Sequence, residues 1–164
     1  MPCLDIVIFG ATGFTGKHVV AEMIKMVKEY PELTWGVAGR SKDKLQALMS
    51  ELAEKTGEDL TKVVVIVADC GDPKSLKSMC ERAKVLVNCC GPYRFLGAPV
   101  VQAAIQGEAH YVDVCGEPQF MEQMQLDYDA QARYAGVYVI SGCGFDSIPA
   151  DMGVIYLQKK FEGG

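Results

Sequence analysis

Three glycines near the start of the chain have the spacing of a turn that binds nucleotide phosphates. They follow the apolar run Leu4–Phe9 directly and lead into a segment with helical periodicity. One glycine permits a tight bend, one lets the backbone approach a pyrophosphate, and one lets helix and strand pack closely. A glycine-rich turn can also be a plain connector, but its place between a strand and a helix favours a dinucleotide site. The predicted phosphate-binding residues are Gly10, Thr12, Gly13, Phe14, Thr15 and Gly16.

The residues after the second apolar run favour NADP(H) over NAD(H) as the cofactor. Folds that prefer NAD carry an acidic residue here, where it binds the ribose hydroxyls. This chain has Gly39, Arg40 and Ser41 instead, without a carboxylate. The Arg40 guanidinium can bind a 2′-phosphate through two charge-assisted hydrogen bonds, with the Ser41 hydroxyl beside it. The alternative makes Arg40 a solvated loop residue and Ser41 only the N-cap of the next helix.

Polar residues after the third and fourth apolar runs are candidates for further cofactor contacts. Asp69 ends the third run, where a hydrogen bond to the adenine base is predicted. Asn88 and Gly91 follow the fourth run. We expect them to lie against the ribose and the nicotinamide, because ligands in such sheets bind at the carboxyl ends of the strands.

The loops after the later strands supply the candidates for the substrate side of the site. Tyr93 follows the fourth run, Asp113 ends the fifth, and Asp146 follows the sixth. We assign these three residues positioning roles near the substrate. No residue of the chain is assigned as general acid or base.

Cysteine and histidine offer little support for thiol or metal chemistry. A nucleophilic thiol at Cys115 or Cys143 would need a neighbouring base that lowers its pKa. The only histidines are His18, within the first helical segment, and His110, at the start of a strand whose far end carries Cys115. We therefore interpret the two cysteines as small packing residues, and we predict no metal site.

Apolar strand-like runs recur along the chain and are separated by segments of helical length. This alternation predicts an α/β fold with a doubly wound parallel sheet of the Rossmann type. Prolines are expected to open four of the helices. The predicted strands are Leu4–Phe9, Thr34–Ala38, Lys62–Ala68, Lys84–Cys89, Ala109–Val114 and Val137–Ser141. The prolines are Pro73, Pro99, Pro118 and Pro149, the last beginning a helix that runs to about Lys160.

Composition limits the classes of protein to which the chain can belong. Its 164 residues predict one domain over 1–164, and a hydrophobic content of 49% with 23% charged residues indicates a folded core. A net charge of −5 without a basic run argues against nucleic-acid binding. The apolar runs are too short for a transmembrane span, and no secretion signal is recognised at the start. Seven cysteines without a Cys-x-x-Cys pair are interpreted as reduced thiols of an intracellular protein.

Five stretches of the sequence together resemble the saccharopine dehydrogenase-like oxidoreductases. The resemblance spans essentially the whole chain, and the last two stretches are more specific than a glycine fingerprint alone. The stretches are Gly10–Gly16, Ala38–Ser41, Asn88–Tyr93, Gly116–Phe120 and Gly142–Asp151.

The resemblance implies an N-terminal Rossmann domain followed by a larger domain that shapes the substrate pocket. Residues 1–164 are then expected to be truncated before that domain and to be inactive alone. The implied reaction is hydride transfer to an imine, carbonyl or enoyl group of an unidentified small molecule. Surfaces that normally meet the second domain are expected to favour a homo-oligomer of this chain.

The same resemblance raises a link to lipids. Bacterial members are similar to trans-acting enoyl reductases of lipid synthesis, and animal members are associated with lipid droplets and membranes. This implies an apolar substrate and a lipid-droplet or membrane-associated location. The alternative function is a non-catalytic module that senses nucleotides or acts as a scaffold there, because a fold does not by itself determine function.

Overall fold

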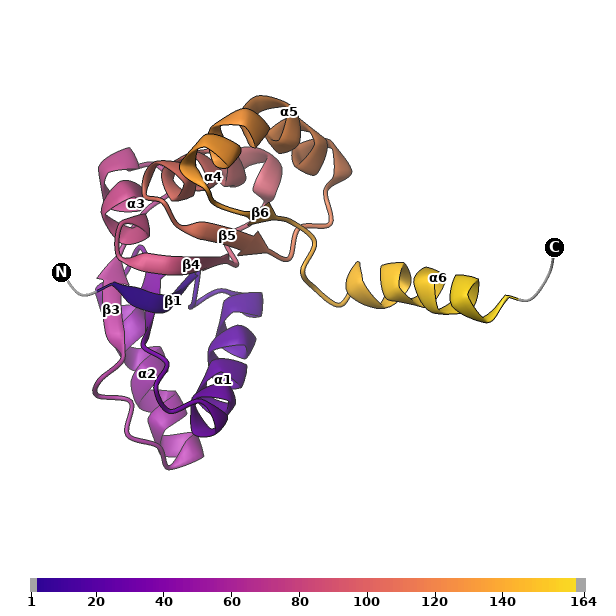
Figure 1. The fold of residues 1–164 in the computed structure, drawn as a ribbon. Coiled ribbons are helices and arrows are strands. Elements are labelled where there is room, and N and C mark those ends of the chain that lie inside the picture. Colours follow the sequence, from indigo (N-terminus) through magenta and orange to yellow (C-terminus); the bar gives the residue numbers. More distant parts are fainter. Residues whose placement is uncertain (1–2, 162–164) are drawn as a thin grey trace.

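The computed structural model describes residues 3–161, in which strands and helices alternate along the chain (Figure 1). Each of the six predicted strands is confirmed, with bounds within two residues of those expected. The strands are β1 (Leu4–Phe9), β2 (Trp35–Gly39), β3 (Val64–Val67), β4 (Ala83–Asn88), β5 (His110–Asp113) and β6 (Val139–Ile140). The helices are α1 (Phe14–Glu29), α2 (Lys42–Thr56), α3 (Pro73–Cys80), α4 (Tyr93–Gln106), α5 (Pro118–Ala135) and α6 (Ile148–Lys160).

The strands form one parallel sheet in the order β3-β2-β1-β4-β5-β6. The chain winds outward from β1 in one direction and from β4 in the other, which confirms the doubly wound Rossmann-type fold. Phe9 at the end of β1 pairs with Ala38 on one side and Asn88 on the other, and Asn88 pairs with Asp113. The carboxyl ends of the central strands therefore meet at one edge of the sheet, where the predicted site residues gather.

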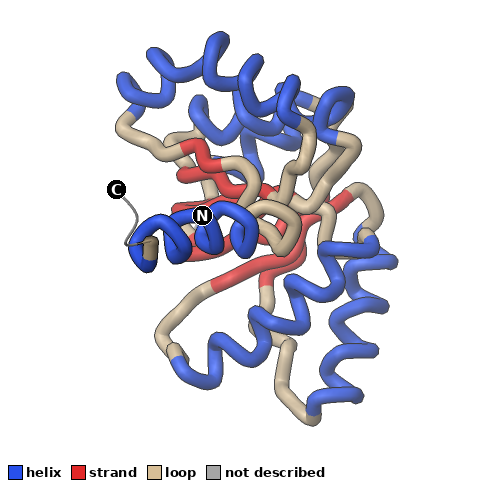
Figure 2. The backbone as a smooth tube through the Cα atoms, turned by 90° about the vertical axis from the view of Figure 1, so that its right-hand side faces the viewer, coloured by secondary structure: helices blue, strands red, loops and turns tan. Residues whose placement is uncertain are grey.

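Helices cover the sheet from both sides (Figure 2). In β1, Val7 and Phe9 point into a core cluster that includes α3, α4 and α5, whereas Ile8 points into a cluster with α1 and α2. This follows from the alternation of side chains along a strand. Both clusters consist of fully or nearly fully buried apolar side chains, so the central strands are apolar on both faces.

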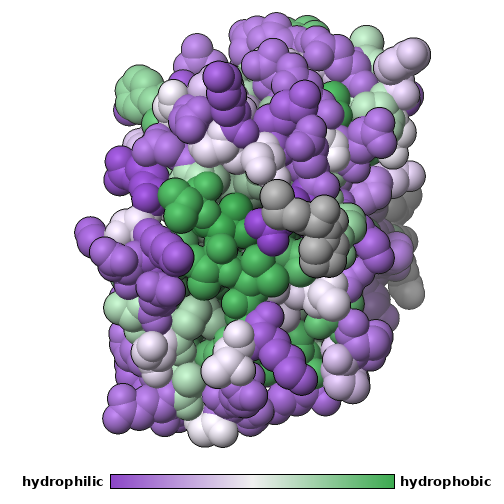
Figure 3. All heavy atoms as spheres, turned by 90° about the vertical axis from the view of Figure 1, so that its left-hand side faces the viewer, coloured by the Kyte–Doolittle hydropathy of each residue, from purple (hydrophilic) through white to green (hydrophobic). Residues whose placement is uncertain are grey.

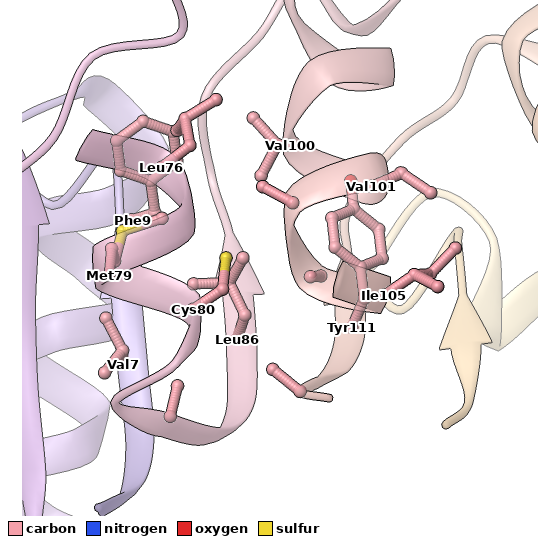
Figure 4. Close-up of a cluster of buried hydrophobic side chains, with 14 of the residues drawn as sticks. Val7, Phe9, Leu76, Met79, Cys80, Leu86, Val100, Val101, Ile105 and Tyr111 are labelled. Carbon is pink, nitrogen blue, oxygen red and sulfur yellow. The ribbon is translucent and has the colours of Figure 1, made fainter. Parts of the chain in front are cut away.

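The larger core cluster lies between the sheet and helices α3 and α4 (Figure 4). Leu86 of β4 and Tyr111 of β5 enter it from the sheet, and Leu76 of α3 and Val100 of α4 enter it from the helices. All four side chains are fully buried. Burying a side chain of this size stabilises the fold by roughly 1.5–3 kcal/mol.

The prolines open helices at three of the four expected positions. Pro73 and Pro118 are the first residues of α3 and α5, and Pro149 lies in the first turn of α6. The prediction for Pro99 was wrong, because α4 begins six residues earlier, at Tyr93, and contains Pro99 in its interior. The Glu117 carboxylate, which lies directly before α5 in the sequence, makes this earlier start possible because it binds the first N–H groups of α4.

Beyond β4, the sheet is open on the face that α1 and α2 cover elsewhere. Tyr111 points into the larger core, so Val112 and its register partner Ile140 point to the opposite face. Val112 is only partly buried, and Ile140 is 50% exposed.

Helix α6 projects away from the sheet and buries none of its residues (Figure 1). Large apolar side chains along it face solvent, and Val154 and Leu157 are about two-thirds exposed. A further hydrophobic surface lies on the side of the molecule that carries β3 (Figure 3). Val67 of this edge strand is half exposed. None of the helices over residues 3–161 combines the length and the apolar character that crossing a bilayer requires.

We expect the chain to self-associate through α6, because exposed apolar area of this extent is unusual on a monomer. Light scattering across a concentration series should give a mass above that of one chain. The variants Val154→Glu and Leu157→Glu should lower it, whereas the control Lys159→Glu on the same helix should not. A single mass equal to one chain at every concentration would contradict this expectation.

Candidate functional site

The glycine turn between β1 and α1 has the geometry of a phosphate-binding turn. Gly10 has a φ of +78°, and a Cβ at this position would lie 3.0 Å from the main-chain nitrogen of Cys90. A Cβ at Gly16 would lie 2.1 Å from the carbonyl oxygen of Gly10. Gly10 therefore permits the bend and the close approach of the β4 loop, and Gly16 permits the close packing of α1 on the turn.

The first turn of α1 is open to a ligand. Gly13 precedes the helix in an extended conformation, and no side chain caps the helix at this end. Thr12, Phe14 and Thr15 are exposed, and the first turn contains no acidic residue. The first N–H groups of a helix have no partner within the helix, and the helix dipole favours negative charge there. The residues present therefore fit a pyrophosphate group.

Arg40 and Ser41 lie at the end of β2, where the sequence placed them. Arg40 is exposed at the carboxyl edge of the sheet, and its side chain makes no ion pair among the described residues. Ser41 is the N-cap of α2, and its hydroxyl accepts a hydrogen bond of 3.4 Å from the main-chain N–H of Lys44. The capping role of Ser41 is thus present, while Arg40 remains open to a 2′-phosphate.

Asp69 begins a tight turn after β3. One of its carboxylate oxygens accepts a hydrogen bond of 2.8 Å from the N–H of Gly71, and its own N–H donates to the Ser75 hydroxyl at 3.0 Å. The side chain is partly buried. The turn therefore fixes Asp69 at the edge where an adenine contact is predicted.

Asn88 is the last residue of β4, at the carboxyl edge of the sheet, and is fully buried. Its amide nitrogen donates to the Tyr111 hydroxyl at 3.0 Å, and its amide oxygen accepts from the N–H of Cys90 at 2.9 Å. The Tyr93 hydroxyl donates to the Asn88 carbonyl oxygen at 2.9 Å. Asn88 therefore fixes the start of the loop that carries the exposed Gly91, and its side-chain contacts are internal.

Asp113 is the centre of a buried polar network. One carboxylate oxygen accepts from the Tyr111 hydroxyl at 2.8 Å and from the Ser141 hydroxyl at 3.1 Å. The other accepts from the N–H groups of Cys115 and Gly142, at 2.9 and 3.0 Å. The side chain is 1% exposed. This carboxylate joins the loops after β5 and β6, and burial raises the pKa of the neighbouring Tyr111 hydroxyl well above its usual range.

The three candidates for the substrate side have different surroundings. Tyr93 is 8% exposed, and burial raises the pKa of its hydroxyl. Asp113 is enclosed in the network just described. Asp146 is exposed and lies close to Gly116, where an added Cβ would come within 3.0 Å of its carboxylate. Of the three residues, only Asp146 is exposed to solvent.

Glu117 is a positioning residue that the sequence reasoning missed. Its two carboxylate oxygens accept hydrogen bonds from the N–H groups of Tyr93 and Arg94, at 2.9 and 3.0 Å. Glu117 thereby caps the start of α4 from the loop after β5, which explains why α4 begins ahead of Pro99. In the sequence, Glu117 stands directly before Pro118 and therefore indicates only the start of α5. No neighbouring residue indicates that its carboxylate binds a helix that begins 24 residues earlier.

Within residues 3–161, the thiols of Cys115 and Cys143 form hydrogen bonds with main-chain groups only. Burial raises the pKa of both the Cys115 and the Cys143 thiols. His110 accepts a hydrogen bond from the N–H of Tyr138 at 3.0 Å, and the His18 ring packs against Phe14 on α1. Residues 3–161 contain no group of three or more potential ligand side chains that could hold a metal ion.

The chain is similar in sequence to proteins from animals. It is 46% identical over 159 residues to the lipid droplet localized protein of Caenorhabditis elegans, and 47% identical over 164 residues to the saccharopine dehydrogenase-like oxidoreductase of Homo sapiens. These matches cover 97% and 96% of the chain but only 37% and 38% of the two relatives. The chain thus spans less than two-fifths of their length.

Structural comparison supports the same fold. The saccharopine dehydrogenase (L-Glu forming) of Saccharomyces cerevisiae superimposes with a TM-score of 0.72 at 20% identity, over 96% of this chain and 31% of that one. Residues 6–140 match the family described as the saccharopine dehydrogenase NADP binding domain. This match confirms the predicted resemblance and agrees with NADP(H) as the cofactor. The chain belongs to the family of saccharopine dehydrogenase NADP-binding domains.

Proposed function

We propose that this chain is the cofactor-binding part of an NADP(H)-dependent oxidoreductase. The observation that carries the proposal is the glycine turn, in which Gly10 and Gly16 leave no room for side chains and the first turn of α1 is uncapped. The N–H groups of Phe14 and Thr15 would bind the pyrophosphate, since the N–H of Gly13 donates to the Gly10 carbonyl oxygen at 2.9 Å. Arg40 would bind the 2′-phosphate and thereby select NADP(H) over NAD(H).

The proposed reaction is the reduction of an imine, carbonyl or enoyl group. NADPH, when bound, supplies the hydride for such a reduction. The residues of this chain orient the cofactor by fixing the loops that would contact it. Glu117 and Asn88 fix the loop between β4 and α4, and Asp113 joins the loops after β5 and β6. A proton donor for the product would come from the part of the longer relatives that this chain does not span.

A lipid-related substrate and location form the finer part of the proposal. A relative at 46% identity carries the name lipid droplet localized protein. The exposed apolar side chains of α6 and of the open sheet face are compatible with an apolar partner. The second candidate function, a nucleotide-binding scaffold at lipid droplets, rests on the same name. The test is an NADPH oxidation assay on a protein with the full length of these relatives. Turnover of NADPH supports the enzyme, and tight NADPH binding without turnover supports the scaffold.

We expect Arg40→Ala to weaken NADPH binding by roughly 10- to 150-fold, because the loss of a bidentate charged contact costs about 1.5–3 kcal/mol. Calorimetric titrations with NADPH and NADH, each with the unchanged protein and the variant, measure the effect. NADPH should bind more tightly than NADH, and the difference should disappear in Arg40→Ala. The control Arg133→Ala removes an exposed arginine of α5 and should leave both affinities unchanged. Equal NADPH affinity of Arg40→Ala and the unchanged protein would refute the role of Arg40.

A further inference from the structure

Two thiols that are far apart in the sequence meet beside the candidate cofactor site. The sulfur atoms of Cys70, in the loop after β3, and Cys90, in the loop after β4, lie 3.6 Å apart. Both side chains are partly buried. A disulfide bond requires about 2 Å between the sulfur atoms, so a small movement of the side chains would join them.

Hydrogen bonds fix both loops in the positions that bring the thiols together. The N–H of Cys90 donates to the buried Asn88 side chain at 2.9 Å. On the other loop, the N–H of Asp69 donates to the Ser75 hydroxyl at 3.0 Å, directly before Cys70. The neighbouring Cys89 packs instead into the cluster of α1 and α2, on the other face of the sheet. The contact is therefore specific to Cys70 and Cys90.

The surroundings make the two thiols chemically unequal. The hydrogen bond between the two thiols and the positive charge of Arg40 lower the pKa of the Cys90 thiol, against opposing effects of burial and of Asp69. The same hydrogen bond and burial raise the pKa of Cys70. A thiolate is the form that attacks peroxides, whereas a neighbouring thiol can resolve the oxidised product. Cys90 is thus suited to attack and Cys70 to resolve.

We propose that Cys70 and Cys90 form an oxidative modification site, at which a hydroperoxide converts the two thiols into a reversible disulfide. The Cys90 sulfur attacks the terminal peroxide oxygen and the O–O bond breaks. The leaving hydroxide of hydrogen peroxide, or alkoxide of an organic hydroperoxide, takes up the Cys90 proton to form water or an alcohol. Cys90 is then a sulfenic acid. The Cys70 sulfur attacks the Cys90 sulfur, an S–S bond forms, the S–O bond breaks, and the hydroxyl group leaves as water with the Cys70 proton. The two cysteines lose two electrons, which the hydroperoxide gains.

The position of the pair connects its oxidation to the cofactor, a consequence that rests on the proposed function. The main chain of Cys90 lies against Gly10 of the phosphate turn, and the charge of Arg40 acts on both thiols. A dinucleotide that spans Arg40 and the turn would cover both loops and shield the thiols. At a concentration of NADP⁺ about ten times its Kd, the free fraction is about one-tenth, so oxidation should slow roughly tenfold.

The modification is tested by treating the reduced protein with hydrogen peroxide under denaturant-free conditions. The intact mass should fall by two hydrogen atoms, and a peptide containing Cys70 linked to one containing Cys90 should appear on digestion without reductant. Dithiothreitol should restore the original mass. A protein that gains oxygen atoms only, or that links other cysteines, would overturn the proposal.

Cysteine variants test the separate roles of Cys70 and Cys90, and added NADP⁺ tests whether the cofactor shields the two thiols. Oxidation of the Cys70→Ser variant should stop at a Cys90 sulfenic acid, which dimedone traps. The control variant Cys3→Ser changes an exposed cysteine directly before β1 and should form the disulfide normally. If Cys70→Ser fails to fold, the linked peptide of the unchanged protein still decides the matter. Calorimetry that detects NADP⁺ binding, together with an unchanged oxidation rate, would refute shielding. Absence of NADP⁺ binding, with the disulfide still formed, would refute the proposed function and leave the modification site standing.

Discussion

Replacing Gly16 by alanine should abolish tight NADPH binding and destabilise the domain. The new Cβ would lie 2.1 Å from the Gly10 carbonyl oxygen and 2.8 Å from the Ala11 Cα, both main-chain atoms that have no room to yield. Helix α1 would have to move away from the turn, at a cost of about 3 kcal/mol in the free energy of unfolding. Because the N–H groups of α1 would move with it, two or more charge-assisted hydrogen bonds would be lost, and the NADPH affinity should fall about 100-fold or more.

The measurements are urea unfolding for stability and calorimetry for NADPH affinity. Gly153→Ala is the matched control, because Gly153 lies in the exposed helix α6 with open space around it. It should leave the affinity unchanged and raise helix stability by up to about 1 kcal/mol. A Gly16→Ala protein that binds NADPH as the unchanged protein does would show that the close packing of α1 on the turn is not required.

Replacing Asp113 by alanine should destabilise the domain more than the removal of any surface carboxylate. The Asp113 side chain accepts four hydrogen bonds in a fully buried position. Its loss leaves the Tyr111 and Ser141 hydroxyls and two main-chain N–H groups without an acceptor. Each buried donor without a partner costs about 1–3 kcal/mol, so we expect a loss of about 3 kcal/mol or more.

Urea unfolding of Asp113→Ala, followed by circular dichroism, measures this loss. The control Asp129→Ala removes an exposed carboxylate that pairs with Arg133 on the same helix, and it should change the stability by less than about 0.5 kcal/mol. Asp113→Asn separates shape from charge, since the amide keeps the volume but turns one acceptor into a donor. Equal unfolding midpoints for Asp113→Ala and Asp129→Ala would refute the structural role of this network.

Local sequence patterns were sufficient for most of the fold. The six strands are short apolar runs between helical segments, and their observed bounds lie within two residues of the predicted bounds. The prediction for Pro99 failed because it relied on a local preference. The start of α4 depends on the Glu117 carboxylate, which is distant in the sequence and close in space.

The place of a candidate residue in the fold was predictable where the residue directly follows a strand. The glycine turn, Arg40 and Asp69 lie at the strand ends, and the topology brings these ends to one edge of the sheet. The surroundings of Asn88 and Asp113 were not predictable. Both carry polar groups typical of ligand contacts, yet their partners are residues on other strands and loops.

The amino-acid sequence by itself determined the order of strands and helices, the glycine-rich turn between β1 and α1 and the preference for NADP(H), because each depends on side-chain types within a few residues. Only the tertiary structure decided which polar residues support the site from within: the Asn88–Tyr111–Asp113 network, the Glu117 cap and the Cys70–Cys90 contact. Periodicity assigns a side chain to a face of a strand. It does not specify the atom that the side chain meets there, because that depends on the register and packing of elements 20 or more residues apart.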